Sequence, residues 1–332
     1  MMARGGRTRL SDIGEGSLVA ALVRESLPAV DVRIGPGDDC AQLRLGGRDW
    51  LWTTDSQVEG THFHLDWMTP REIGAKAYSI NASDIAAMGG KPRFVLVSFG
   101  APAKFSSRAM IAIQRGISAM AARDGAVIVG GNVVRCPHLE VTISMLGLSP
   151  KFAMPRSGAR AGDRIYVSGT LGDAALGLRQ LRANPRATGA AVWRFRRPEP
   201  RVRAGSLLAE RRVASAMIDL SDGLLEDLER VCEASGVGAR IDLRALPLSR
   251  AVARADRSLA LSGGEDYELL CAVPARQEAA LSRMSADLDC AMTRIGVFCE
   301  SSEGITTMAG ADSIALPRRR FAHFSRKTRA GR

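Results

Sequence analysis

The chain has 332 residues, which is long for one hydrophobic core and sufficient for two domains. It is 46% hydrophobic and 24% charged, as in ordinary globular proteins, and no run approaches the length of about 18 apolar residues that a membrane-spanning helix needs. The net charge is +11, from 46 basic and 35 acidic residues, which fits either a solvated basic surface or attraction of polyphosphate ligands. Nucleic acid is disfavoured as a partner, because the Arg residues are scattered and no zinc-finger or RNP-like motif accompanies them.

The cysteines predict a reducing compartment. None of them shows the C-x-x-C spacing of a metal or redox site, so they resemble small buried hydrophobic residues. The N-terminal stretch MMARGGRTRLSDIGEG is basic but lacks the apolar region of a secretory signal. A cytoplasmic protein is therefore expected. The six cysteines are Cys40, Cys136, Cys232, Cys271, Cys290 and Cys299.

The first elements are a short helix over residues 14–27 and a strand over residues 39–45. Alternation in that strand places Ala41, Leu43 and Leu45 on one face, and Asp39 shares it. Asp38 would lie on the other face, so Asp39 is the better candidate for a buried ligand. The Gly46-Gly47 pair predicts a hairpin turn into a strand over residues 49–55, which ends at Asp55 behind Thr53-Thr54.

A helix is predicted from Pro70 to about Met88. Thr69-Pro70-Arg71-Glu72 is a capping box with proline at the first helical position. Ile73, Ala77, Ile80 and Asp84 then follow the spacing of one apolar face. A carboxylate in a core costs several kcal/mol, on the order given by transfer data, unless it is paired or holds a cation. Either Asp84 points into a ligand site or the stripe is rotated and Asp84 is solvated.

The remaining chain alternates strands and helices, so the fold class is α/β (α+β), with a mixed or antiparallel sheet in the first half. Pro, Gly and Arg concentrate at residues 149–162, which divides the chain into domains 1–150 and 151–325 with a basic tail at 326–332. Residues 183–200 are expected to form a loose basic stretch. Further strands are predicted at 94–99, 126–132, 139–148, 164–168, 217–219, 239–243 and 293–298, and helices at 106–123, 224–234 and 276–284.

Carboxylates at strand ends, at turns and on the core-facing helix predict a magnesium site, because Mg²⁺ prefers oxygen ligands and substrate phosphates. Zinc is disfavoured, since the four His residues have no H-x-x-x-H spacing. No Walker A motif or G-x-G-x-x-G turn occurs, so phosphates would be held by metal ions, by glycine-turn backbone and by an Arg such as Arg156. The residues alone leave the substrate open. The acids concerned are Asp39, Asp55, Asp84, Asp219 and Asp222.

Seven motifs in series give the chain a family resemblance: GPGDDCA, TTDSQVEGTHF, AYSINASDIAAMGGKP, VIVGGN, MPRSGARAGD, IDLSDGL and SGGEDYEL. In this order and spacing they resemble the thiamine-monophosphate kinases of the aminoimidazole-ribonucleotide-synthetase-like superfamily, over about residues 12–324. The resemblance implies an N-terminal metal- and ATP-binding domain that forms a β-barrel, flanked by helices, with its copy in a homodimer. It also implies a C-terminal α/β layered domain and ATP in the cleft between domains. No membrane or nucleic-acid partner is expected from the hydropathy and the scattered Arg residues.

The implied reaction transfers the γ-phosphoryl group of ATP to thiamine monophosphate, giving thiamine diphosphate, with several Mg²⁺ ions. Carried over by motif, the substrate contacts are His62, Glu265 and Phe321, and the ATP contacts are Gly131, Asn132, Arg156 and Ser221. The catalytic set is Asp55, Asp84, Arg156 and Asp222. The metal ligands are Asp39, Thr53, Thr54, Asp55, Asp84, Asn132, Asp219 and Asp222.

One position departs from the family pattern. The family has Gly-Gly-Asp-Thr where this chain has Gly130-Gly131-Asn132-Val133, so Asn132 keeps a ligand oxygen but loses a charge. Asn132 would bind Mg²⁺ more weakly or hydrogen-bond a phosphate-bound water. A non-catalytic ATP-binding paralogue is therefore one alternative. Others are a nucleic-acid-binding protein, or a superfamily enzyme such as aminoimidazole ribonucleotide synthetase, selenophosphate synthetase or a hydrogenase-maturation factor.

Overall fold

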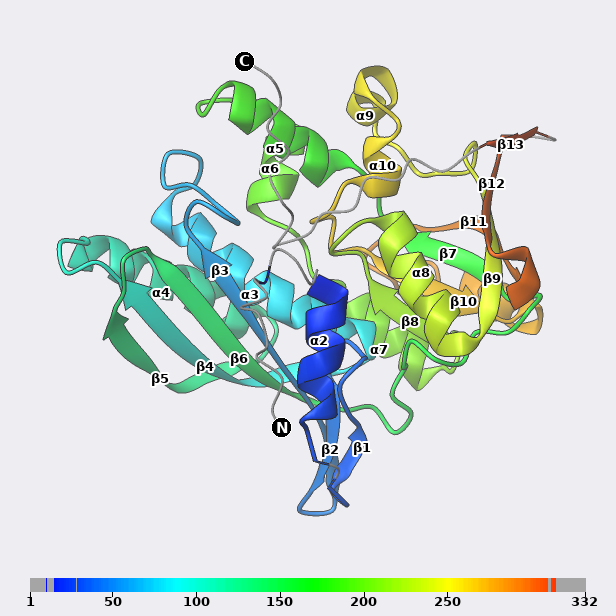
Figure 1. Ribbon diagram of the computed structural model, residues 1–332, viewed down its shortest axis with the longest axis horizontal. Coiled ribbons are helices and arrows are strands. Elements are labelled where there is room, and N and C mark those ends of the chain that lie inside the picture. Colours follow the sequence, from blue (N-terminus) through cyan, green and yellow to red (C-terminus); the bar gives the residue numbers. More distant parts are fainter. Residues whose placement is uncertain (1–9, 11–14, 28, 310–311, 315–332) are drawn as a thin grey trace, which may run out of the picture.

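The computed structural model describes residues 10, 15–27, 29–309 and 312–314. In this part of the chain, two separate β-sheets stand side by side with helices packed on them (Figure 1). The described part contains no helix that is long and apolar enough to cross a membrane. The predicted substrate residue Phe321 and the basic tail at 326–332 lie outside the described residues.

The first sheet has six strands in the order β1-β2-β3-β6-β4-β5. Only β4 and β5 run parallel, so the sheet is mixed, as predicted. Helix α2 (Glu15–Arg24) precedes it, and helices α3 (Pro70–Ala87) and α4 (Ser107–Arg123) accompany it. The strands are β1 (Val32–Ile34), β2 (Ala41–Leu45), β3 (Arg48–Val58), β4 (Lys91–Ala101), β5 (Val127–Arg135) and β6 (Glu140–Leu148).

The second sheet has seven strands in the order β13-β12-β9-β11-β7-β10-β8. Its strands are β7 (Arg164–Ser168), β8 (Ala216–Asp219), β9 (Val237–Asp242), β10 (Leu269–Val273), β11 (Met292–Glu300), β12 (Ile305–Ala309) and β13 (Asp312–Ile314). Its helices are α5 (Asp173–Ala183), α6 (Ala190–Arg196), α7 (Val202–Glu210), α8 (Leu224–Ser235), α9 (Arg250–Ala255), α10 (Leu259–Ser262) and α11 (Glu278–Arg283), with the 3₁₀ turns η1 (Ala275–Gln277) and η2 (Ser301–Glu303). The two sheets support the mixed α/β class, and in the described chain neither of them closes into a barrel.

The β2–β3 hairpin forms as predicted, but the predicted apolar face of β2 is wrong. Gly46 and Gly47 both have positive φ, which a two-residue primed turn requires, and Leu45 pairs with Arg48 across it. Gln42 is the residue that β2 buries, because its side-chain amide donates to Ser149 Oγ at 2.8 Å. Leu45, expected on the buried face, is 44% exposed.

Helix α3 begins with the predicted capping box. The Thr69 side chain accepts a hydrogen bond from the Glu72 backbone N–H, and the Glu72 carboxylate accepts one from the Thr69 backbone N–H. The helix is buried on nearly every side, not only along the predicted stripe. It contacts β3, β6 and α4 of the first sheet region as well as α7 and β8 of the second (Figure 1). Because α3 is shared by both halves, its side chains can reach groups from either of them.

The expectation of a loose stretch at 183–200 is wrong. Helix α6 lies within it and buries Val192 and Phe195. The surrounding prolines and arginines do not predict a helix. Helix α6 is stabilised by its burial against other elements, which the local sequence does not reveal. Helix α7, helix α9 and strands β1, β12 and β13 were likewise not predicted.

Candidate active site

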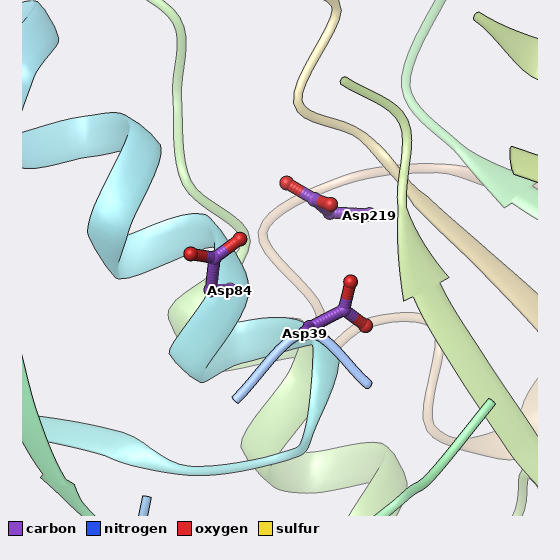
Figure 2. Close-up of side chains that lie close together, drawn as sticks. All are labelled: Asp39, Asp84 and Asp219. Carbon is purple, nitrogen blue, oxygen red and sulfur yellow. The ribbon is translucent and has the colours of Figure 1, made fainter. Parts of the chain in front are cut away.

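Three carboxylates from distant parts of the sequence meet between the two sheets. Asp39 comes from the loop before β2, Asp84 from α3 and Asp219 from the end of β8 (Figure 2). Each offers an oxygen atom that lies within 4.8 Å of the others. The structure therefore brings together three of the predicted metal residues, including the helix residue for which a solvated position was the alternative.

A separate hydrogen bond orients each of these carboxylates. The Thr53 hydroxyl donates to Asp84 Oδ2 at 2.5 Å, and the Ser83 hydroxyl donates to Asp219 Oδ2 at 2.6 Å. The Arg156 guanidinium donates to Asp39 Oδ1 at 2.6 Å. Thr53 and Arg156 were predicted from the sequence. Ser83 was not, although its place beside Asp84 on a core-facing helix was a usable signal.

The three carboxylates repel one another when they are ionised, and their pKa values are raised. Burial raises the pKa of Asp39 to about 7, against the lowering effect of Arg156 and with a further contribution from the Asp219 carboxylate. Burial likewise raises the pKa of Asp219 to about 6. Burial, followed by the neighbouring carboxylates, raises the pKa of Asp84 well above its usual value. A cation bound beside these three acids would favour their ionised forms.

The donor set fits a hard divalent cation. Asp39 Oδ2 is buried and accepts no hydrogen bond from the described residues, so this oxygen is available to a cation. The adjacent Cys40 thiol does not compete as a ligand, because burial and the nearby aspartates raise its pKa well above its usual value. Carboxylate and hydroxyl oxygens without soft ligands favour Mg²⁺ over Zn²⁺.

Asp55 and Asp222 extend the acidic surface beyond this trio. The Asp55 backbone N–H donates to Asn81 Oδ1 on α3 at 3.1 Å. The Asp55 side chain is open to solvent, yet surrounding protein atoms, and then the Asp222 carboxylate, raise its pKa to about 6. Asp222 forms an ion pair with Arg230 at 2.5 Å, so its carboxylate has a protein partner in this state.

The loop around Glu265 runs tightly against the loop that carries Ser221. The Glu265 N–H donates to the Ser221 carbonyl at 2.7 Å. A Cβ atom on Gly264 would lie 2.5 Å from that same carbonyl oxygen, so only glycine fits there. Glu265 and Tyr267 both adopt left-handed φ, of 69° and 51°. Non-glycine residues held in this region cost about 1–3 kcal/mol each, and such strain often marks functional loops.

Lys76 is a residue of this region that the sequence reasoning missed. Its buried ammonium group forms an ion pair with Glu265 Oε2 at 2.8 Å. A signal was available, because Lys76 stands two helical turns before Asp84 on a helix that was predicted to face the core.

Two other predicted contacts, His62 and Thr54, form hydrogen bonds with backbone groups. His62, in the loop after β3, is half-buried and accepts a hydrogen bond from the Val58 N–H at 3.1 Å. The Thr54 hydroxyl donates to the Ile143 carbonyl of β6 rather than toward the carboxylates.

Gly131 and Asn132 are not brought to the carboxylates within one chain. They lie on β5, the edge strand, where Asn132 pairs with Ser98 of β4. Strands β4 and β6 separate β5 from β3, so about 14 Å of sheet lies between Asn132 and the strand of Asp55.

Comparison with known proteins places the chain beside a group of kinases. Residues 37–149 match the family model "AIR synthase related protein, N-terminal domain", and residues 160–308 match "AIR synthase related protein, C-terminal domain". The thiamine-monophosphate kinase of Escherichia coli (strain K12) is 36% identical over 327 residues, covering 94% of this chain and 98% of that protein. That of Mycobacterium tuberculosis (strain ATCC 25618 / H37Rv) is 40% identical over 273 residues, covering 79% and 81%.

A solved structure is similar over nearly the whole chain. AaThiL complexed with AMPPCP and TMP superposes with a TM-score of 0.82 at 29% sequence identity. The match covers 96% of this chain and all of that one. The similarity therefore includes both sheets and the region between them.

Proposed function

The chain belongs to the thiamine-monophosphate kinase family, and we propose that its carboxylate site carries out the reaction of that family. The reaction transfers the γ-phosphoryl group of ATP to the phosphate of thiamine monophosphate, giving thiamine diphosphate and ADP. One observation carries the proposal: Asp39, Asp84 and Asp219 converge within 4.8 Å in a chain that matches these kinases almost end to end. The solved complex with AMPPCP, an analogue of ATP, and TMP supports the same pair of ligands.

Magnesium ions would bind the carboxylates of Asp39, Asp84 and Asp219, with Asp55 and Asp222 beside them. Bound Mg²⁺ reduces the repulsion between two anionic reactants and stabilises charge on the transferring phosphoryl group. The protein itself supplies orientation: Thr53 and Ser83 fix two carboxylates by hydrogen bonds. Arg156 adds a positive charge beside Asp39.

The site needs no strong general base. The acceptor is a phosphate oxygen that is already ionised, so no proton has to be removed before it attacks. The clustering of Asp39, Asp84 and Asp219 supports this, because carboxylates gathered at one point suit the binding of a cation. On this reading Arg156 and Ser221 contact ATP, and His62 and Glu265 contact thiamine monophosphate. The catalytic role of Asp55, Asp84, Arg156 and Asp222 is to hold metal and phosphates in line.

A homodimer completes the proposal. Strand β5 is an open edge whose valines are exposed, with Val133 at 72%. Exposed apolar edge strands invite pairing with a second chain. A second copy pairing along this surface would close the barrel that the resemblance implies. Gly131 and Asn132 would then face the partner copy, which accounts for their distance from the carboxylates of their own chain.

The remaining parts of the proposal concern organisation and location. The N-terminal unit, residues 1–150, would bind metal and ATP and would dimerise, and residues 151–325 would form the second domain. A cytoplasmic location remains a prediction from the cysteines.

The direct test is an assay of the purified protein with ATP, Mg²⁺ and thiamine monophosphate. We expect thiamine diphosphate and ADP in equal amounts, and no product above a no-enzyme control would contradict the function. Asp55→Ala should reduce the rate constant kcat by about 100-fold or more, because it removes a metal-side carboxylate. Thermal unfolding should show that this variant stays folded. Asp66→Ala, on an exposed position of the β3–α3 loop, is the matched control and should keep full activity.

A further inference from the structure

Lys76 holds a fully buried positive charge beside the proposed substrate site. Its side chain is 1% exposed, and its Nζ atom lies 2.8 Å from Glu265 Oε2. The same ammonium group sits 3.8 Å from the centre of the Phe195 ring, in cation–π geometry. A buried ammonium group is costly unless it is paired, so this pair has to be maintained for the loop to stay in place.

Glu265 is restrained on one oxygen and open on the other. Its side chain is 21% exposed, and its Oε1 atom accepts no hydrogen bond from the described residues. The backbone is fixed by the bond to Ser221 and by the strained left-handed conformation. If the ion pair served only to stabilise the fold, Oε1 would not need to stay available to a ligand at the end of a strained loop.

Helix α6 joins this pair to the loop that carries His62. Trp67 packs edge-on against Phe195, with ring centres 6.4 Å apart, and His64 packs against Trp67 at 4.1 Å. Arg194, next to Phe195, forms an ion pair with the buried Glu268. A continuous row of side chains thus runs from His64 through Trp67 and Phe195 to Lys76 and Glu265, and it starts in the loop that carries His62.

We propose that Lys76 is a positioning residue for the thiamine end of the substrate and acts through Glu265. By holding Oε2, Lys76 aims Oε1 at the ring system of the substrate. Because Lys76 already neutralises the carboxylate charge, Oε1 serves as a hydrogen-bond acceptor for an N–H donor of the thiamine rings, not as a lone counter-ion. Lys76 itself does not touch the substrate. This inference rests on the proposed function, and it adds a residue and a role to it.

The test separates binding of the two substrates. Lys76→Met should raise the KM for thiamine monophosphate about 10-fold or more, and should change kcat and the KM for ATP by less than about threefold. Calorimetric Kd values for thiamine monophosphate alone should weaken by the same factor. In a cycle with Glu265→Gln, the double variant should bind no worse than Glu265→Gln, because Lys76 acts only through that side chain.

A second variant keeps the test decisive if Lys76→Met does not fold. Phe195→Leu retains the charges of Lys76 and Glu265 but removes the ring beneath the Lys76 ammonium group. It should therefore raise the KM for thiamine monophosphate by a smaller factor than Lys76→Met does. Lys91→Met, which breaks an exposed pair with Glu210, is the control and should change neither KM.

Each outcome decides a different question. Absence of thiamine diphosphate with the unaltered protein would reject the proposed function itself. An active unaltered protein with an unchanged KM for thiamine monophosphate in Phe195→Leu and in folded Lys76→Met would overturn the role of Lys76 alone. Equal increases in both KM values, or additive effects in the cycle, would also overturn it by showing a general structural role.

Discussion

Single buried carboxylates outside the metal cluster show how this chain tolerates charge in its interior. Glu268 is enclosed by Ser168 and by the guanidinium groups of Arg194 and Arg201. Asp227 accepts the backbone N–H groups of Asp222 and Gly223 at the start of α8, and it also forms an ion pair with Arg230. Asp266 has no cationic hydrogen-bond donor among the described residues and accepts only from backbone N–H groups. Of the three, Asp266 is therefore the one whose protonation should be visible in stability.

Asp266 should make stability fall as the pH rises. Burial raises the pKa of Asp266 to about 8, despite the hydrogen bond from the Gly172 N–H. The unfolded chain ionises this group near pH 4, so the folded state binds the extra proton between about pH 4 and 8. Its stabilising effect is complete below pH 4 and is lost progressively up to pH 8. Asp266→Asn keeps an acceptor oxygen but cannot ionise.

The measurement is urea unfolding at several pH values between 5 and 8. Unaltered protein should lose stability relative to Asp266→Asn by on the order of 1 kcal/mol per pH unit in this range. Asp31→Asn, at an exposed position before β1, should track the unaltered protein throughout. Parallel curves for Asp266→Asn and the unaltered protein would contradict the assignment.

At the scale of elements, the α3–α4 pair depends on two glycines. A Cβ atom on Gly74 would lie 2.0 Å from the Ile113 carbonyl oxygen, and one on Gly116 would lie 2.1 Å from that of Arg71. The two helices therefore touch backbone to backbone at both positions. This contact fixes α3, which carries Lys76, Ser83 and Asp84.

Gly74→Ala should force the helices apart and lower the free energy of unfolding by about 2–3 kcal/mol. Activity should fall with it, because Asp84 moves with the helix. Chemical denaturation and the kinase assay measure the two effects. Gly35→Ala is the matched control, since its Cβ would meet only Val32 Cγ1 at 3.8 Å, and it should change stability by less than about 0.5 kcal/mol. A stable, active Gly74→Ala protein would show that α4 can shift without cost.

Elements whose signals are local could be predicted, and those stabilised by distant contacts could not. The capping-box residues Thr69 and Glu72 predicted the start of helix α3, and Gly46-Gly47 predicted the hairpin. Helix α6 carried no such signal, because Phe195 is ordered by Lys76 and Trp67 from other parts of the chain. The face of β2 was misjudged for the same reason, since Ser149 decides which side Gln42 takes.

The same distinction holds for the site. Acids at strand ends, at turns and on a core-facing helix, Asp219 among them, indicated a metal centre, and the order of the motifs added the role of each residue. The partnership of Lys76 with Glu265 joins residues 189 positions apart, and nothing in either local sequence specifies it. The distance of Asn132 from the carboxylates also depends on strand order, which the sequence left open.

At the scale of the whole molecule, the open β5 edge predicts the assembly state. The unaltered protein should have the mass of a dimer by light scattering coupled to size-exclusion chromatography. Val133→Lys places a charge on the exposed edge and should shift the protein toward monomer. If Gly131 and Asn132 act across the dimer, the monomer should also lose kinase activity while its circular dichroism spectrum stays unchanged.

Val19→Lys, on an exposed position of α2, is the control and should leave the mass unchanged. A monomeric unaltered protein that is fully active would show that the edge strand has no part in the reaction.

The burial of α3 from both sides has a consequence for how the protein is made. Its Ser83 hydroxyl is covered by Asp219, which the ribosome adds 136 residues later. At a synthesis rate of about 5–20 residues per second, this delay is roughly 7–27 s. The first sheet is complete once Leu148 has been added, but the face of α3 destined for α7 and β8 stays uncovered until those later elements are made. The nascent first half is thus an apolar, aggregation-prone intermediate, and we expect chaperone binding to concentrate on this helix until the second half emerges.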